Sequence, residues 1–180
     1  RLIDATIIDL CLSVFSWAKF STTKGGIKLH YELDYAGNIP SFLVITDIKD
    51  HETTVMKRYF DITADSIYCF DRGYNDFVLY RRITQGKAYF VTRAKDNLVY
   101  TVTGQHTETL KKGILSDEVI SLNNKKYTYP LRLIRYYDDE SGEVIAFITN
   151  NFKLAPHTIT QIYKARWQIE IFFKKFHQFY

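Results

Sequence analysis

The sequence predicts a mixed α/β fold, with three antiparallel strands, two parallel strands joined through helices, and a β-rich insertion before a closing helix. Three observations support this: early segments alternate apolar and polar residues, later apolar runs interleave with helical ones, and the last segment is amphipathic without Gly or Pro. With 180 residues, of which 46% are hydrophobic, the chain can build one substantial core.

The first three predicted strands are joined by turns. Residues 2–10 are rich in aliphatic and β-branched side chains and include Asp4, and residues 27–34 alternate apolar and polar positions. Gly37-Asn38 supplies a tight turn before the third strand, residues 39–47. Because these connections are loops and turns, we expect the three strands to pair antiparallel.

Helical segments connect the next two strands. Residues 51–60 have a helical pattern and precede a short apolar strand, residues 66–71. Asn75 or Asp76 can cap the following helix, and residues 87–93 form the fifth strand. Strands joined through helices can run parallel, so Asp71 at the end of the fourth strand would lie near Asp4 if that strand adjoins the first.

After the fifth predicted strand, the sequence changes from alternating helices and strands to short strand-like segments separated by turns. Turn signals at Gly104, Gly113, Asn123-Asn124 and 138–142 separate segments that resemble strands. We therefore predict a core of residues 1–96, a β-rich insertion of residues 97–149 and a core completion of residues 150–180. The predicted insertion strands are 98–103, 118–122, 126–138 and 143–149.

The closing segment, residues 157–180, is predicted to be one amphipathic helix. At ~100° per residue, one narrow stripe collects a phenol, a carboxylate and several basic groups. An apolar band lies beside this stripe, and Gln161 and Lys164 fall on the far side, which suits water. The stripe consists of Tyr163, Arg166, Glu170, Lys174 and His177.

Three carboxylates on separate elements, Asp4, Asp71 and Glu170, are candidates for a shared metal site. Acidic groups that converge without a buried cation repel one another, and a divalent ion relieves this repulsion. Oxygen ligands favour Mg²⁺ or Mn²⁺, and two such ions can drive phosphodiester displacement. Spacing alone leaves the alternative that the three are salt-bridge or cap residues.

Four motifs in order resemble the catalytic core of DDE transposases of bacterial insertion sequences, in the subgroup with a Tyr-x2-Arg-x3-Glu-x6-Lys signature. The resemblance covers essentially the whole chain and implies a ribonuclease H-like fold, which agrees with the strand order above. The motifs are the segment 4–10, the segment 24–30, Asp71-Arg72-Gly73-Tyr74 and Tyr163-x2-Arg166-x3-Glu170.

The resemblance implies a role for each matching position. Asp4, Asp71 and Glu170 match the metal-binding catalytic triad, with two Mg²⁺ or Mn²⁺ ions expected. Tyr163 and Arg166 match positions that hold DNA phosphates. Arg72 is equally well explained as a DNA contact or as the counterion of a carboxylate.

The chain departs from the signature at one position. The signature predicts Lys at position 177, where this sequence has His177. Lys174 lies one helical turn earlier on the same stripe and is a candidate substitute. Either this subgroup differs, or the departure marks an inactive element.

Composition and motif content limit the kinds of partner that the chain can bind. A net charge of +4 permits a polyanionic partner without requiring one. The two cysteines and five histidines show no metal-ligand spacing, Gly25-Gly26 lacks the rest of a nucleotide-binding loop, and no apolar run is long enough to span a membrane. These features predict a cytoplasmic protein with no nucleotide cofactor and no membrane partner. The resemblance implies in addition that the protein is bacterial and nucleoid-associated.

The favoured function is metal-dependent DNA cleavage and strand transfer at insertion-sequence ends. The alternatives are a catalytically inactive DNA-binding relic, for which His177 is the motivating residue, and a nuclease of the same fold. The resemblance also implies double-stranded DNA as partner, at element ends and target, and a homodimer on paired ends. It further implies that an N-terminal DNA-binding domain and a C-terminal tail are absent from this piece.

Overall fold

The computed structural model describes residues 1–10, 25–34, 39–47, 51–106 and 113–166, with only the backbone described for most of residues 4–47. The chain divides into two compact units, one containing Arg1–Asp61 and the other Ile62–Trp167. The fold is mixed α/β, as the sequence predicts.

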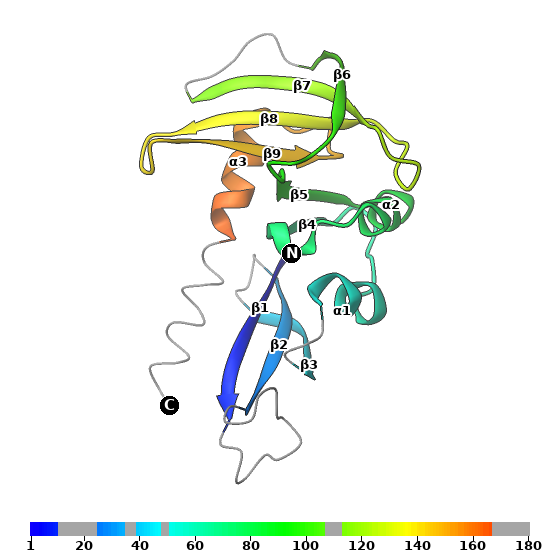
Figure 1. The fold of residues 1–180 in the computed structure, drawn as a ribbon, viewed down its shortest axis with the longest axis vertical. Coiled ribbons are helices and arrows are strands. Elements are labelled where there is room, and N and C mark those ends of the chain that lie inside the picture. Colours follow the sequence, from blue (N-terminus) through cyan, green and yellow to red (C-terminus); the bar gives the residue numbers. More distant parts are fainter. Residues whose placement is uncertain (11–24, 35–38, 48–50, 107–112, 167–180) are drawn as a thin grey trace. The chain divides into compact units, whose positions relative to one another are not determined.

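The first unit is built on an antiparallel β-meander, shown in blue in Figure 1. Asp4 lies within the first strand, where its register partner is Tyr31. Leu2 and Ile3 are buried, and Arg1 forms an ion pair with the buried Glu32. The predicted antiparallel pairing is confirmed. The elements are β1 (Leu2–Leu10), β2 (Gly25–Asp34), β3 (Ile39–Asp47) and α1 (Glu52–Tyr59).

The second unit contains a mixed sheet with the strand order β4-β5-β9-β8-β7-β6. Among the strand pairings described in this unit, β4 with β5 is parallel and the others are antiparallel. The helix α2 connects β4 to β5, as predicted. The strands are β4 (Ile67–Phe70), β5 (Tyr89–Arg93), β6 (Tyr100–Gln105), β7 (Ile114–Leu122), β8 (Leu131–Asp138) and β9 (Glu143–Thr149). The helices are the 3₁₀ turn η2 (Arg72–Tyr74), α2 (Phe77–Gln85) and α3 (Pro156–Ala165).

The strands of the predicted insertion continue the sheet that β4 and β5 begin. Val91 of β5 is the register partner of Thr149 of β9, and β8 pairs with β9 on its other side. Figure 1 shows these strands stacked from β5 to β7 in one layer, with α3 against that layer. The domain limits drawn from the sequence remain a prediction.

Local chemistry explains where several elements begin. Asp76 caps α2 because its Oδ1 accepts the Leu79 N–H at 2.9 Å. β7 begins at Ile114, earlier than the predicted residue 118, directly after Gly113. Gly113 has φ +86°, and a Cβ there would lie 2.7 Å from the Tyr136 ring, so only glycine fits.

The strand β8 begins later than predicted, at Leu131 instead of residue 126. Pro130 directly precedes it and has no N–H to donate to a ladder. Tyr127 is buried in the preceding turn instead, where its hydroxyl lies 3.2 Å from Thr84 Oγ1.

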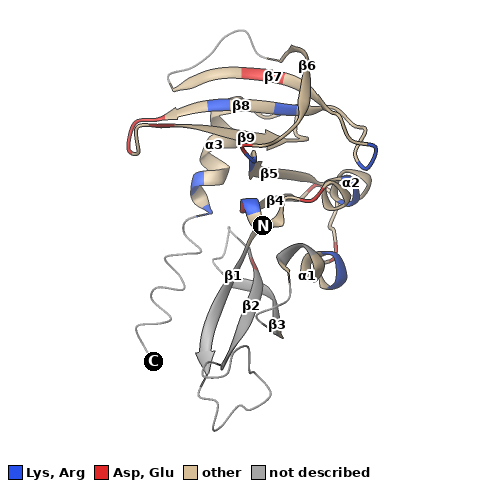
Figure 2. Ribbon diagram, in the orientation of Figure 1, with Lys and Arg blue, Asp and Glu red and all other residues tan. Residues whose placement is uncertain are grey.

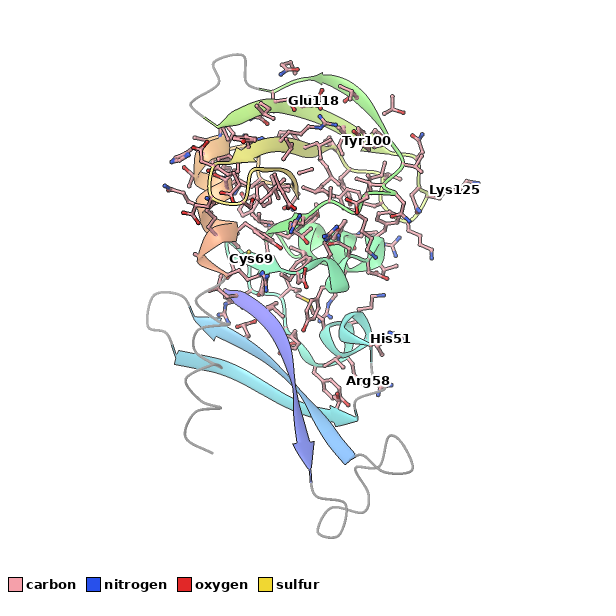
Figure 3. All side chains as sticks on the ribbon, turned by 60° about the vertical axis from the view of Figure 1, so that its left-hand side comes forward. His51, Arg58, Cys69, Tyr100, Glu118 and Lys125 are labelled. Atoms are coloured by element: carbon pink, nitrogen blue, oxygen red, sulfur yellow. The ribbon has the colours of Figure 1, made fainter. Side chains whose placement is uncertain are left out.

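Aromatic rings fill the core of the second unit. Tyr80 and Phe90 stack with their centroids 4.3 Å apart, and Phe70 packs against both. Cys69, labelled in Figure 3, is also buried, and burial raises the pKa of its thiol to about 12. The thiol is therefore a neutral core group. No helix in the described residues is long and apolar enough to cross a membrane.

Candidate active site

The ends of the two parallel strands define the site. Cys69 pairs with Val91, so Asp71 and Arg93, two residues further along each chain segment, emerge at the same edge of the sheet. Both line a hollow of about 360 Å³ in the second unit, which we call the Asp71 hollow. Its other lining residues are Arg72, Asp138, Ile145, Phe147, Tyr163, Lys164 and Arg166.

The helix α3 brings Tyr163 and Arg166 to this hollow. It begins with Pro156, whose fixed φ suits the first helical turn, and is described as far as Ala165. The Tyr163 ring packs on Phe147 with centroids 5.0 Å apart, and the Arg166 guanidinium lies over the Tyr163 ring at 5.4 Å. Tyr163 is 5% exposed and Arg166 6% exposed, so both are held by packing.

A buried arginine fixes the loop that leads into α3. Arg132 and Asp117 are both 0% exposed and form a two-point ion pair, with N–O distances of 3.0 and 2.7 Å. Arg132 Nη1 also donates to the carbonyl oxygens of Asn151 and Leu154, at 2.8 and 2.7 Å. Because these carbonyls lie just before Pro156, Arg132 ties β8 to the start of the helix that carries Tyr163 and Arg166.

The Asp71 hollow also contains a second acidic group, Asp138. Asp138 Oδ1 accepts from Lys164 Nζ at 2.6 Å, and Oδ2 accepts from the Ser141 hydroxyl at 2.9 Å. The bond from Lys164 holds the pKa of Asp138 below its usual value, and Asp138 in turn raises the pKa of Lys164. The Lys164 side chain is 35% exposed, so the expectation that it faces water is met only in part. The ion pair with Asp138 holds the ammonium group over the Tyr136 ring.

Burial also sets the protonation state of Tyr163. Desolvation raises the pKa of its hydroxyl to about 12, although the Arg166 charge acts in the opposite direction. Tyr163 is therefore a neutral phenol throughout the physiological range. A neutral phenol can donate a hydrogen bond to an anionic oxygen.

The chemistry of the Asp71 side chain fits a hard metal ion. Asp71 is half-buried, and its Oδ1 accepts the N–H of Arg72. The carboxylate is an oxygen-only donor of the kind that Mg²⁺ and Mn²⁺ prefer. Among the residues that the structure describes, no three His, Cys, Asp or Glu side chains form a metal-binding group.

Four of the predicted site residues meet in the second unit: Asp71, Arg72, Tyr163 and Arg166 all line the Asp71 hollow. Arg72 also forms an ion pair at 3.3 Å with Asp96, which is almost fully exposed. Asp4 belongs to the other unit, and its side chain is not described. Glu170, Lys174 and His177 lie outside the described residues.

Three further residues of the hollow, Arg93, Asp138 and Lys164, were missed as site residues. Arg93 has a signal that could have identified it, because it ends a strand parallel to the one that precedes Asp71. In the sequence, Asp138 lies where the predicted strand 126–138 meets the turn 138–142, and neither pattern indicates a site residue. Figure 2 shows basic residues on α3, on β8 and at the end of β5, and acidic residues at the turn between β8 and β9.

Comparison with known proteins places these features in a family. The chain matches the family described as "Transposase DDE domain" over residues 1–180. It is 33% identical over 181 residues to "Putative transposase y4zB" of Sinorhizobium fredii, covering 97% of this chain and 50% of that protein. It is 25% identical over 177 residues to "Probable transposase for insertion sequence element IS5377" of Geobacillus stearothermophilus, covering 97% and 46%. The chain thus spans about half the length of these curated relatives.

Proposed function

Because this chain belongs to the transposase DDE domain family, we propose that it is the catalytic domain of a transposase that cuts and rejoins DNA at insertion-sequence ends. The observation that carries the proposal is the Asp71 hollow, where an acidic strand end meets Tyr163 and Arg166 of α3. The mixed sheet with parallel β4 and β5 supports a ribonuclease H-like arrangement. The substrate is double-stranded DNA, so the protein would act in the bacterial cytoplasm at the nucleoid, as a homodimer on paired ends.

The proposed reaction centre is formed by Asp4, Asp71 and Glu170. These three carboxylates would hold two Mg²⁺ or Mn²⁺ ions. When bound, such ions activate the attacking oxygen and stabilise the leaving oxygen of a phosphodiester. No nucleotide cofactor is required, because the phosphodiester bond itself supplies the leaving group.

The residues of α3 would hold the phosphate. Arg166 supplies a positive charge that packing keeps over Tyr163, so little side-chain freedom is lost when a phosphate binds. Tyr163 supplies a hydroxyl donor beside it. Lys164 is committed to Asp138, and its role is to fix the hollow's wall instead of contacting DNA.

We expect Tyr163→Phe to weaken DNA binding by roughly three- to tenfold, the effect of one net hydrogen bond. Because the pKa of Tyr163 is raised to about 12, its proton is retained and this factor should be constant from pH 7 to pH 10. Fluorescence anisotropy on a labelled duplex measures it. A factor that falls to one near pH 10 would show that the phenol ionises there and would contradict this role.

The experiment that tests the function is nicking of a DNA duplex carrying the element's terminal repeat, with the full-length protein and Mg²⁺. We expect single-strand nicks that disappear in EDTA, followed by joining of the freed 3′ hydroxyl to a second duplex. Nicking without joining would favour the nuclease alternative.

If the chain is instead a catalytically inactive relic, a separate result is expected at His177, where the family signature has Lys. If the native protein binds DNA without nicking and His177→Lys restores nicking, the chain is a decayed transposase. Nicking by the native protein at a rate that His177→Lys leaves unchanged would instead show that this subgroup does not need the lysine.

A further inference from the structure

Two further hollows lie beside the Asp71 hollow on the second unit. The next one, of about 180 Å³, shares Arg93 with it and also contains Lys95, Leu98 and Arg135. A third hollow, of about 500 Å³, shares Lys95 and Leu98 with the second. Shared lining residues place the three next to one another, and we call the second and third together the distal groove. It runs along residues 94–99, which connect β5 to β6.

Basic side chains line each part of the groove, together with two carboxylates that have partners of their own. Asp96 in the second hollow pairs with Arg72, and Asp76 in the third hollow caps α2. Arg93 lines the entrance of the groove, Lys95 its middle and Lys126 its far end. None of these three forms a salt bridge within the described residues. Arg135 is different, because it pairs with Glu118 at 2.5 Å and donates to the Tyr100 hydroxyl at 2.6 Å; Tyr100 and Glu118 are labelled in Figure 3. Lys95 donates only a long hydrogen bond, of 3.5 Å, to the carbonyl oxygen of Asn75. Arg93, Lys95 and Lys126, which no carboxylate neutralises within the described residues, therefore suit an anionic polymer that passes from one hollow to the next.

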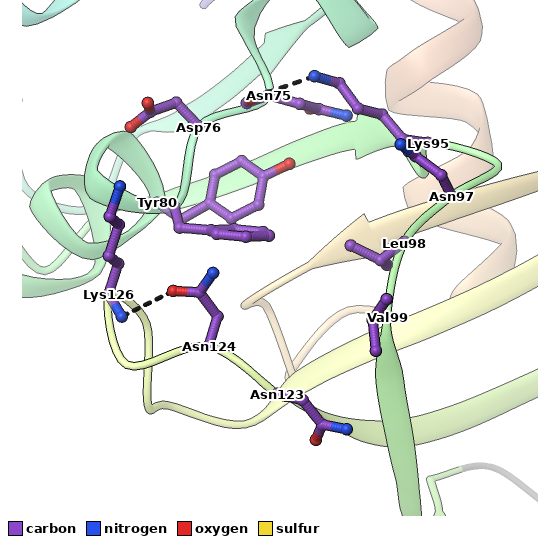
Figure 4. Close-up of a pocket in the computed structure, with 11 residues that line it drawn as sticks. Asn75, Asp76, Tyr80, Lys95, Asn97, Leu98, Val99, Asn123, Asn124 and Lys126 are labelled. Carbon is purple, nitrogen blue, oxygen red and sulfur yellow. Dashed lines mark hydrogen bonds between the residues drawn. The ribbon is translucent and has the colours of Figure 1, made fainter.

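The third hollow adds an aromatic wall and amide donors. Figure 4 shows Lys95 and Asn97 on one side, Asn124 and Lys126 on the other, and the Tyr80 hydroxyl directed towards the Lys95 side. The Phe77 ring is half-buried and packs edge-on against Tyr80, with centroids 6.0 Å apart. Asn124 Oδ1 accepts the Lys126 N–H at 2.8 Å, which fixes the amide and leaves its NH₂ group as a donor.

This set of groups fits one kind of ligand. An aromatic ring accepts a stacked base, amide NH₂ groups donate to base oxygens and nitrogens, and ammonium groups contact phosphates. A volume of about 500 Å³ suits a ligand of nucleotide size. A duplex is too wide to enter such a hollow, and its base edges are already paired. The chemistry is therefore that of an unpaired nucleotide.

We propose that the distal groove binds a single-stranded DNA segment continuous with the phosphate at the Asp71 hollow, and that one base of this segment stacks on Phe77. The inference rests on the proposed function, because that function brings DNA to the hollow. Lys126 contacts the backbone of the same segment, and Asn97 and Asn124 contact the stacked base.

The test compares two fluorescein-labelled probes bound by the full-length protein in EDTA. One is a blunt duplex of about 20 base pairs, and the other carries in addition an oligothymidine flank of about 10 nucleotides. We expect the flank to raise affinity roughly tenfold or more, the effect of stacking one base. Phe77→Leu should reduce this gain below about threefold and leave binding of the blunt duplex unchanged.

Lys126→Gln provides an independent variant on an exposed side chain, for which folding is not at risk. It should lower the salt slope of the flank-dependent binding by about 0.7, the contribution of one single-strand phosphate contact. Lys125→Gln is the matched control, because Lys125 is the exposed neighbour that does not line the groove. It should change neither the flank gain nor the slope.

Three results would overturn the proposal: no gain from the flank, an equal gain from a double-stranded flank, or variants that weaken both probes alike. Nicking with Mg²⁺ is measured separately, so that failure of the groove proposal can be distinguished from failure of the proposed transposase function. Loss of the flank gain with intact nicking overturns the groove alone. An intact flank gain without nicking overturns the proposed function alone.

Discussion

Replacing Arg132 by methionine is expected to destabilise the protein by about 3–5 kcal/mol, because it leaves the buried Asp117 carboxylate without its counterion. The carbonyl oxygens of Asn151 and Leu154 lose their donor in the same change. A typical domain is stable by only about 5–15 kcal/mol, so this is a large fraction of the total. Urea unfolding followed by circular dichroism measures it.

Arg135→Met is the matched control for Arg132→Met. Arg135 lies on the same strand and also pairs with a carboxylate, Glu118, but both side chains are partly exposed. Its loss should cost about 1 kcal/mol or less. The double variant Arg132→Met, Asp117→Leu should recover part of the loss, because it removes the stranded charge. Equal destabilisation by Arg132→Met and Arg135→Met would refute the anchoring role of Arg132.

Asp71→Asn is expected to lower the nicking rate by about 10³-fold or more. The amide keeps the shape of the carboxylate but carries no charge for a divalent ion, whose stabilisation of the transition state amounts to several kcal/mol. DNA binding should be unchanged or slightly tighter, because a negative charge beside the phosphate is removed. Single-turnover nicking of a labelled terminal-repeat duplex separates the two effects.

Asp96→Asn is the control for Asp71→Asn. Asp96 is exposed, does not line the Asp71 hollow, and forms an ion pair with Arg72, the residue next to Asp71. Its change should leave the nicking rate within about twofold, as expected for a weak surface pair. A nicking rate for Asp71→Asn within tenfold of the native protein would remove Asp71 from the reaction centre.

Local patterns predicted much of the fold because they act over a few residues. The Asp76 cap and the apolar run before Asp71 each depend only on neighbouring residues, and the elements they predict are present. The predicted turn at Gly37-Asn38 lies outside the described residues, and the strands before and after it pair antiparallel. Boundaries moved where a single residue overrides the pattern. Gly113 allows β7 to begin early, and Pro130 delays β8.

Long-range partners were harder to predict. Asp117 and Arg132 look like ordinary strand charges in sequence, and only their burial opposite each other makes them an anchor for α3. A helical wheel places Lys164 on the side of the helix that faces water. It contains no information on Asp138, which lies on another element and forms an ion pair with Lys164. For the same reason, the spacing of the residues does not predict that Asp71 shares a site with Tyr163 and Arg166. That prediction depends on the family resemblance.

The most direct test of the central proposal counts Mn²⁺ ions bound to the full-length protein on its terminal-repeat DNA by electron paramagnetic resonance. We predict two ions per active site in the native protein, and weakened binding of at least one of them in Asp71→Asn and in Glu170→Gln. Mn²⁺ binding that is the same in the native protein and both variants would contradict a reaction centre built on these carboxylates.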